Sequence, residues 1–124
     1  MPKLLIVDDE KDVREFSKNF FRKRSVDSLT ASGGIEALAL IALEKPDLIL
    51  LDVRMGEMSG IDVLRVLRKE GSLVRVVMIS GMNDEEVVKE AASLGAIGFI
   101  HKPLVLEELE RVVLAELNKA HVNC

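Results

Sequence analysis

The chain has 124 residues, a formal net charge of −4 and one cysteine, Cys124, at its end. This length fits a single domain around one core, the acidic balance argues against direct nucleic-acid binding, and one terminal thiol excludes an internal disulfide. The chain has neither a signal-peptide pattern at its start nor an apolar run near the ~20 residues that cross a membrane, so we expect a soluble cytoplasmic protein without membrane contact.

Strand and helix patterns alternate along the chain. Short apolar runs predict strands at Lys3–Val7, Val26–Ala31, Leu48–Leu51, Val74–Ile79 and Ala96–Ile100. Helical spacing predicts helices at about Glu10–Arg24, Ile35–Glu44 and Gly60–Lys69, a fourth that turns Val87, Ala91 and Leu94 inward, and a fifth at about Val105–Ala120. In the first helix the apolar stripe is Val13, Phe16 and Phe20. Asn83 is expected to cap the start of the fourth helix.

Five successive strand–helix units predict an α/β fold, a doubly wound five-stranded parallel sheet with helices on both faces. Three of the strands run directly into charged residues, which are Asp8-Asp9, Asp52 and His101-Lys102. The carboxyl ends of parallel strands meet at one edge, where open α/β sheets bind ligands. Three carboxylates placed together repel one another, so Lys102 and a divalent cation with oxygen ligands are expected to neutralise them.

These features resemble the receiver domain of two-component response regulators, including the chemotaxis regulators, over essentially every residue from Leu4 to Leu117. The residues that carry the resemblance are Asp8-Asp9, Leu50-Leu51-Asp52 followed by Met55, Met58 and Gly60, Ser80-Gly81, and Phe99 to Pro103. No single motif is specific alone, but together they follow the order and spacing of the family. The resemblance implies the flavodoxin-like strand order 2-1-3-4-5.

The resemblance implies that Asp52 is the phosphoacceptor, with its carboxylate as the nucleophile toward phosphorus. It implies an Mg²⁺ ion held by Asp8, Asp9, Asp52 and the backbone carbonyl of Arg54. Lys102 is then expected to pair with a phosphoryl oxygen. The phosphoryl group is expected to come from the phosphohistidine of a sensor histidine kinase or a phosphotransfer protein.

The resemblance also implies a switch, in which the hydroxyl of Ser80 is drawn toward the phosphoryl group and Phe99 moves into the space that Ser80 leaves. The Lys102–Pro103 peptide bond is expected to be cis. The face formed by the fourth helix, fifth strand and fifth helix is expected to bind an effector or a second copy. Two alternatives stay open: Phe99 as an ordinary core residue, and the apolar residues flanking the fifth helix as ordinary surface scatter.

The sequence departs from the family at two positions. Gly56 stands where a proline is common, which predicts a more mobile loop from Asp52 to Ser59 and a less preorganised Mg²⁺ site. Ser80 replaces the commoner threonine, which predicts a looser switch. At the end of the chain, His121 and Cys124 are three residues apart, but an unstructured tail is expected there in preference to a metal site.

Two alternative functions predict different sequence features. An aspartate-nucleophile phosphatase of the haloacid dehalogenase type is expected to carry an Asp-x-Asp motif after its first strand and a cap, whereas this chain has adjacent Asp8 and Asp9. A phosphorylation-independent interaction module is the other alternative. We therefore expect residues 1–124 to form one receiver domain without an output domain, a signalling phosphoacceptor and not an enzyme. Whether it acts alone or belongs to a longer chain stays open.

Overall fold

The computed structural model describes residues 1–56, 58–81 and 85–122, with side chains up to residue 119. The strands are β1 (Lys3–Val7), β2 (Asp27–Ala31), β3 (Leu48–Asp52), β4 (Val76–Ser80) and β5 (Gly98–His101). The helices are α1 (Lys11–Arg22), α2 (Gly34–Glu44), α3 (Gly60–Lys69), α4 (Glu85–Ser93) and α5 (Leu106–Val122). The expected cap Asn83 and the terminal residue Cys124 lie outside the described residues.

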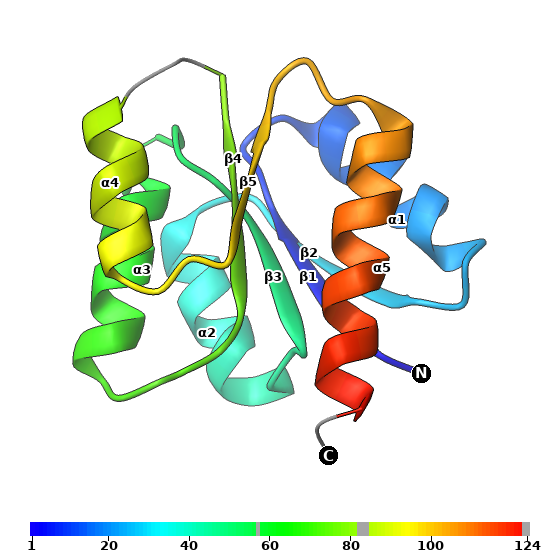
Figure 1. Cartoon of the computed structure of the whole chain (residues 1–124), viewed down its shortest axis with the longest axis horizontal. Helices are drawn as coiled ribbons and strands as arrows, with labels where there is room; N and C mark the ends of the chain where they lie inside the picture. Colours follow the sequence, from blue (N-terminus) through cyan, green and yellow to red (C-terminus); the bar gives the residue numbers. More distant parts are fainter. Residues whose placement is uncertain (57, 82–84, 123–124) are drawn as a thin grey trace.

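The strands form one parallel sheet in the order β2-β1-β3-β4-β5, which confirms the predicted fold. Helices cover both faces of this sheet, with α2, α3 and α4 on one side and α1 and α5 on the other (Figure 1). No helix among the described residues is both long and apolar enough to cross a membrane.

The central strands are buried from both sides, which explains their uninterrupted apolar sequences. In β1 and β3, alternate side chains enter two separate cores. Leu5, Val7, Ile49 and Leu51 pack on the side of α2 and α3, whereas Leu4, Ile6, Leu48 and Leu50 pack on the side of α1 and α5.

Three of the strands that end at the candidate site, β3, β4 and β5, extend beyond their apolar runs. Asp52 continues the ladder opposite Ile79, and Ser80 pairs with His101, so these polar residues belong to β3, β4 and β5. The apolar pattern alone placed the ends of these three strands one residue too early, whereas it placed the ends of β1 and β2 correctly. It also began β4 and β5 two residues early, because Val74 and Ala96 are apolar but precede the paired region.

Helix α1 turns only part of its predicted apolar stripe toward the sheet, where Phe20 packs against the core. Ser17 and Phe21 are its buried residues, while Phe16 is 50% exposed. The stripe of Val13 and Phe16 instead faces Leu104 in the segment between β5 and α5, across a surface groove. Periodicity predicted the helix correctly, but tertiary packing determined which side of it meets the sheet.

Candidate functional site

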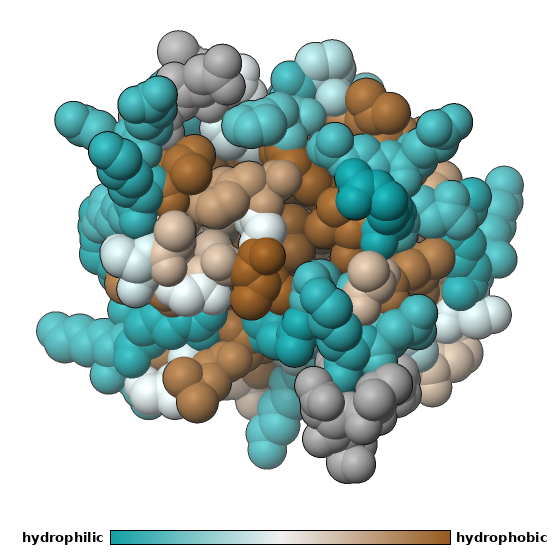
Figure 2. Space-filling model, viewed as in Figure 1, coloured by the Kyte–Doolittle hydropathy of each residue, from teal (hydrophilic) through white to brown (hydrophobic). Residues whose placement is uncertain are grey.

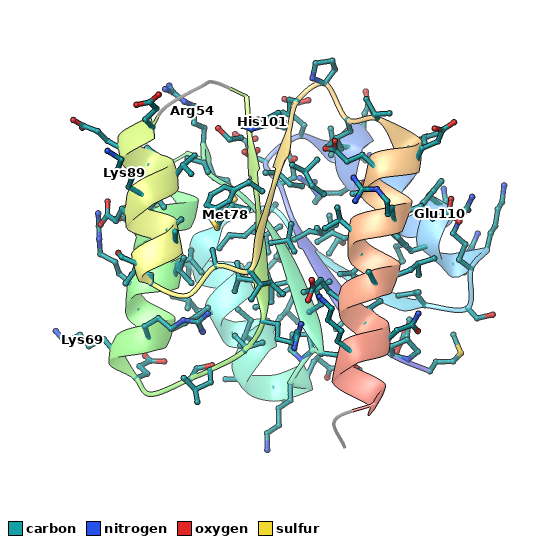
Figure 3. All side chains as sticks on the ribbon, viewed as in Figure 1. Arg54, Lys69, Met78, Lys89, His101 and Glu110 are labelled. Carbon is teal, nitrogen blue, oxygen red and sulfur yellow. The ribbon has the colours of Figure 1, made fainter. Side chains whose placement is uncertain are left out.

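The carboxyl edge of the sheet brings together residues from four strand ends. Asp52 and Ser80 are the last residues of β3 and β4, Asp8 follows β1, and Lys102 follows β5. Asp8 is fully buried, and Asp52 and Ser80 are 2% and 5% exposed. Figure 3 shows His101, beside Lys102, at the same end of the sheet as Arg54.

Lys102 is the cation at the centre of this edge. Its Nζ lies 3.0 Å from Oδ2 of Asp52, 3.5 Å from Oδ2 of Asp8 and 3.9 Å from Oε1 of Glu10. Its backbone N–H donates to the carbonyl oxygen of Ser80, which fixes the start of the following segment against β4. One ammonium therefore serves three carboxylates, and the group retains a net negative charge.

The electrostatics of the site follow from this arrangement. Burial raises the pKa of Asp52, and the charge of Asp8 raises it further, against the lowering effects of Lys102 and the Arg54 N–H. Burial would lower the pKa of Lys102, but its hydrogen bond with Asp52 and the surrounding carboxylates raise it above its ordinary value. Lys102 is therefore charged at neutral pH. The ionised form of Asp52 is destabilised by its burial, and a further cation would stabilise it.

The acidic residues after β1 have the chemistry of a hard-cation site. Carboxylate oxygens of Asp8, Asp9 and Glu10 lie within 4.8 Å of one another. Oδ1 of Asp8 accepts the Glu10 N–H at 2.9 Å, but its buried Oδ2 accepts no hydrogen bond from the described residues. A buried carboxylate oxygen without a donor fits Mg²⁺, which prefers such ligands. Glu10 was not among the residues predicted for this site, although the run Asp8-Asp9-Glu10 was a signal for it.

Backbone contacts hold the loop after β3 close to Asp52. The Arg54 N–H donates to Oδ1 of Asp52 at 3.2 Å, and the Gly60 N–H donates to the carbonyl oxygen of Val53 at 2.9 Å. Ser59 and Asp62 then form a capping box that starts α3. Gly56 does not have a positive φ, so the freedom that glycine offers there is not used in this conformation.

Gly60 allows α3 to begin directly against the end of β3. A Cβ at this position would overlap the carbonyl oxygen of Asp52, whereas a Cβ on Gly56 would meet open space. We expect Gly60→Ala to lower the free energy of unfolding by about 1–3 kcal/mol because the backbone of β3 must shift. Gly56→Ala is the control and should stay within about 0.5 kcal/mol. Urea unfolding measures both, and equal effects would contradict this interpretation.

The remaining predicted residues have defined places. The Lys102–Pro103 peptide bond is cis. Phe99 in β5 is half-buried and packs against the core on the side of α3 and α4. It pairs with Met78, two register pairs before the pair of Ser80 and His101. Neither its movement nor the role of the Arg54 carbonyl is tested by this single conformation, and both stay predictions.

Comparison with known proteins gives a consistent result. The family model for the response regulator receiver domain matches residues 4–114. Sporulation initiation phosphotransferase F of Bacillus subtilis is 31% identical over 111 residues, which cover 90% of each chain. Chemotaxis protein CheY of Listeria monocytogenes is 36% identical, covering 90% of this chain and 98% of its own.

Solved structures agree with the sequence matches. The signal receiver domain of a putative LuxO repressor protein from Vibrio parahaemolyticus has a TM-score of 0.92 at 25% identity, covering 98% of this chain and 94% of its own. Several other relatives are longer, and this chain spans 24% to 51% of their length. The matched region includes every residue of the sheet edge described above. The chain belongs to the family of two-component response regulator receiver domains.

Proposed function

We propose that this protein accepts a phosphoryl group on Asp52 from the phosphohistidine of a sensor kinase or phosphotransfer protein. Receiver domains bind Mg²⁺ at an acidic pocket, work as signalling phosphoacceptors that are generally not enzymes, and interact with such kinases and with effectors. The observation that carries the proposal is the position of Lys102, 3.0 Å from Asp52 and 3.5 Å from Asp8. This arrangement supplies a nucleophile, a cation beside it, and a buried carboxylate oxygen of Asp8 that accepts no hydrogen bond from the described residues.

In the proposed step, a carboxylate oxygen of Asp52 attacks phosphorus, and the P–N bond to the donor histidine breaks. The bonding electrons stay on the imidazole nitrogen, and the product is an acyl phosphate. Lys102 pairs with a phosphoryl oxygen, and the hydroxyl of Ser80 donates to another. Asp8, Asp9, Asp52 and the Arg54 carbonyl would hold Mg²⁺, whose charge would offset the repulsion between the anionic nucleophile and the anionic donor. Glu10 lies close enough to take part through water.

Beryllofluoride binding tests this site without a chemical step. Wild-type protein is expected to bind beryllofluoride in the presence of Mg²⁺, as seen by ¹⁹F NMR, because the complex imitates the acyl phosphate. Asp52→Asn should abolish binding, while the exposed control Asp27→Asn should retain it. Binding that survives in Asp52→Asn would contradict the proposal. The alternative of a phosphorylation-independent interaction module predicts no binding to any of these proteins.

The output surface is proposed to be the face of α4, β5 and α5. Ile97, Val105 and Leu106 on this face are 40%, 56% and 43% exposed, and Phe99 and Val112 lie half-buried between them. Figure 2 shows apolar surface gathered over β5, between the more polar surfaces of α4 and α5. A contiguous apolar area with a polar rim is typical of an interaction site, which supports an effector or a second copy as its partner.

The donor protein is proposed to dock in the groove beside Lys102. This groove has a volume of about 510 Å³ and is lined by Val13 and Phe16 of α1, Pro103 and Leu104, with Glu10 and Asp12 at its rim. Lys102, which contacts Asp52, also lines this groove. A partner seated there could present its histidine to the phosphoacceptor.

The variant Phe16→Ala tests donor docking separately from the phosphorylation step at Asp52. Removing the half-exposed ring should slow phosphotransfer from phosphorylated histidine phosphotransfer domains by about tenfold, the effect of losing one aromatic anchor. Phosphorylation by acetyl phosphate, which needs no docking surface, should be unchanged. Ile35→Ala, at an equally apolar position that is 74% exposed on α2, is the control. Equal slowing with both donors would show that Phe16 acts on the fold and not on docking.

A further inference from the structure

Helix α4 is attached to the rest of the molecule by a small apolar contact. Ala91 is its one buried residue, and Val87 in the helix and Leu94 directly after it are half-buried against the core on that side. The helix lies beside α3 at the side of the molecule (Figure 1). Polar contacts from Arg65 and Arg68 of α3 add to this apolar contact in fixing the position of α4.

The first of these contacts fixes the carboxyl-terminal end of α4. Arg68 of α3 donates from Nε to the carbonyl oxygen of Leu94 at 2.6 Å. Its Nη1 donates to the carbonyl oxygens of Ser72 and Val74 at 3.0 Å and 2.9 Å. Because Arg68 holds the end of α4 and the segment before β4 together, this end of α4 is the one least free to move.

The second contact holds the middle of α4. Nη2 and Nε of Arg65 lie 2.5 Å and 2.6 Å from Oε2 of Glu90, while Nη1 pairs with Oδ1 of Asp62 at 2.7 Å. Arg65 therefore bridges its own helix and α4. Unlike the contacts of Arg68 with carbonyl groups, this bridge depends on the charge of Glu90.

The Arg65–Glu90 pair borders a cavity that reaches the phosphorylation site. The cavity has a volume of about 590 Å³, and its wall combines residues of the site with residues of α3 and α4: Asp9, Arg54, Ser80, Ile61, Arg65, Val87 and Glu90. Negative charge added at Asp52 would attract the guanidinium of Arg65 and repel the carboxylate of Glu90. Both effects weaken the same ion pair.

We propose that the Arg65–Glu90 ion pair is a latch that holds α4 against α3 and opens when Asp52 is phosphorylated. With the latch open, α4 pivots about the end held by Arg68, which changes the face of α4, β5 and α5. This inference rests on the proposed function, since it gives the site its regulatory output. The latch opposes the phosphorylated state, so breaking it by mutation favours that state.

Glu90→Gln tests the latch and leaves the Arg65–Asp62 pair in place. We expect faster backbone amide exchange in α4 and an apparent affinity for beryllofluoride with Mg²⁺ that is about two- to fivefold tighter, the range of a partly exposed ion pair. Arg65→Gln should act in the same direction, and the double variant should add little to either. The control is Glu110→Gln, which breaks the comparably exposed pair with Arg24, 2.9 Å apart and remote from this cavity.

The possible results distinguish a failure of the latch from a failure of the proposed function. Faster exchange in α4 with unchanged or weaker beryllofluoride affinity would overturn the latch and leave the proposed function intact. Unchanged exchange in both single variants would also overturn it. A wild-type protein that binds no beryllofluoride would overturn the proposed function and the latch together.

Discussion

Lys102→Met is expected to lower the free energy of unfolding at neutral pH by about 1–3 kcal/mol in the absence of Mg²⁺. The substitution keeps the length of the side chain but removes the cation from the buried carboxylates of Asp52 and Asp8. Leaving buried charges without a partner is strongly destabilising, and the partial exposure of Lys102 reduces the cost. Urea unfolding measures the change.

The effect of Lys102→Met should depend on pH in a defined direction. Without the lysine, the pKa of Asp52 rises further, because Lys102 supplies two of the influences that lower it. Above this raised pKa the folded protein carries an unpaired carboxylate, and below it the protonated group needs no cation. The loss of stability should therefore be full at pH 7 and shrink toward about pH 4, near the ordinary pKa of the group.

A distant lysine provides the matched control. Lys3 pairs with Glu44 at 3.5 Å on the surface, away from the site. Lys3→Met should cost less than about 1 kcal/mol, with little difference between the two pH values. A loss for Lys102→Met that is equal at pH 7 and at low pH would contradict the assignment of Lys102 as the partner of ionised Asp52.

In contrast to Lys102→Met, Asp8→Asn is expected to raise the free energy of unfolding, by about 1–2 kcal/mol without Mg²⁺. It removes one of three carboxylates that share a single ammonium, together with a buried oxygen that accepts no described hydrogen bond. The side-chain oxygen of asparagine can still accept the Glu10 N–H. Lys102 keeps its hydrogen bond to Asp52.

Asp8→Asn should also remove most of the increase in stability that Mg²⁺ gives the folded protein. A ligand that binds the folded state stabilises it according to its affinity, and loss of a ligating carboxylate should weaken binding by at least about tenfold. Thermal unfolding across an Mg²⁺ titration measures this, with exposed Asp27→Asn as the control. An Asp8→Asn protein that is less stable and keeps its Mg²⁺ response would contradict the site.

The order of strands and helices along the chain could be predicted because the local sequence patterns agree with one another. Leu48 to Leu51 is apolar throughout because β3 is covered on both faces, and Asp52 follows because it stands at the edge of the sheet. The convergence of Asp8, Asp52 and Lys102 then followed from parallel strands alone. Their distances and the missing donor at Asp8 required the structure.

Other features could not be read from sequence because they depend on packing between distant elements. Phe16 belonged to an apolar stripe, but only the docking of α1 showed that its ring is half-exposed beside Lys102. Arg65 and Glu90 are 25 residues apart, and nothing in the local pattern of either helix indicated that they pair. Glu10 was predicted only as the start of the first helix, and its proximity to Asp8 and Asp9 required the structure.

Phosphorylation of Asp52 tests the central claim most directly. We would incubate the protein with acetyl phosphate, with and without Mg²⁺, beside Asp52→Asn and the surface control Asp27→Asn, and determine each intact mass. The expected result is an Mg²⁺-dependent gain of one phosphoryl group in the wild type and Asp27→Asn that is absent in Asp52→Asn. A gain that persists in Asp52→Asn, or no gain in a protein that also fails to bind beryllofluoride, would contradict it.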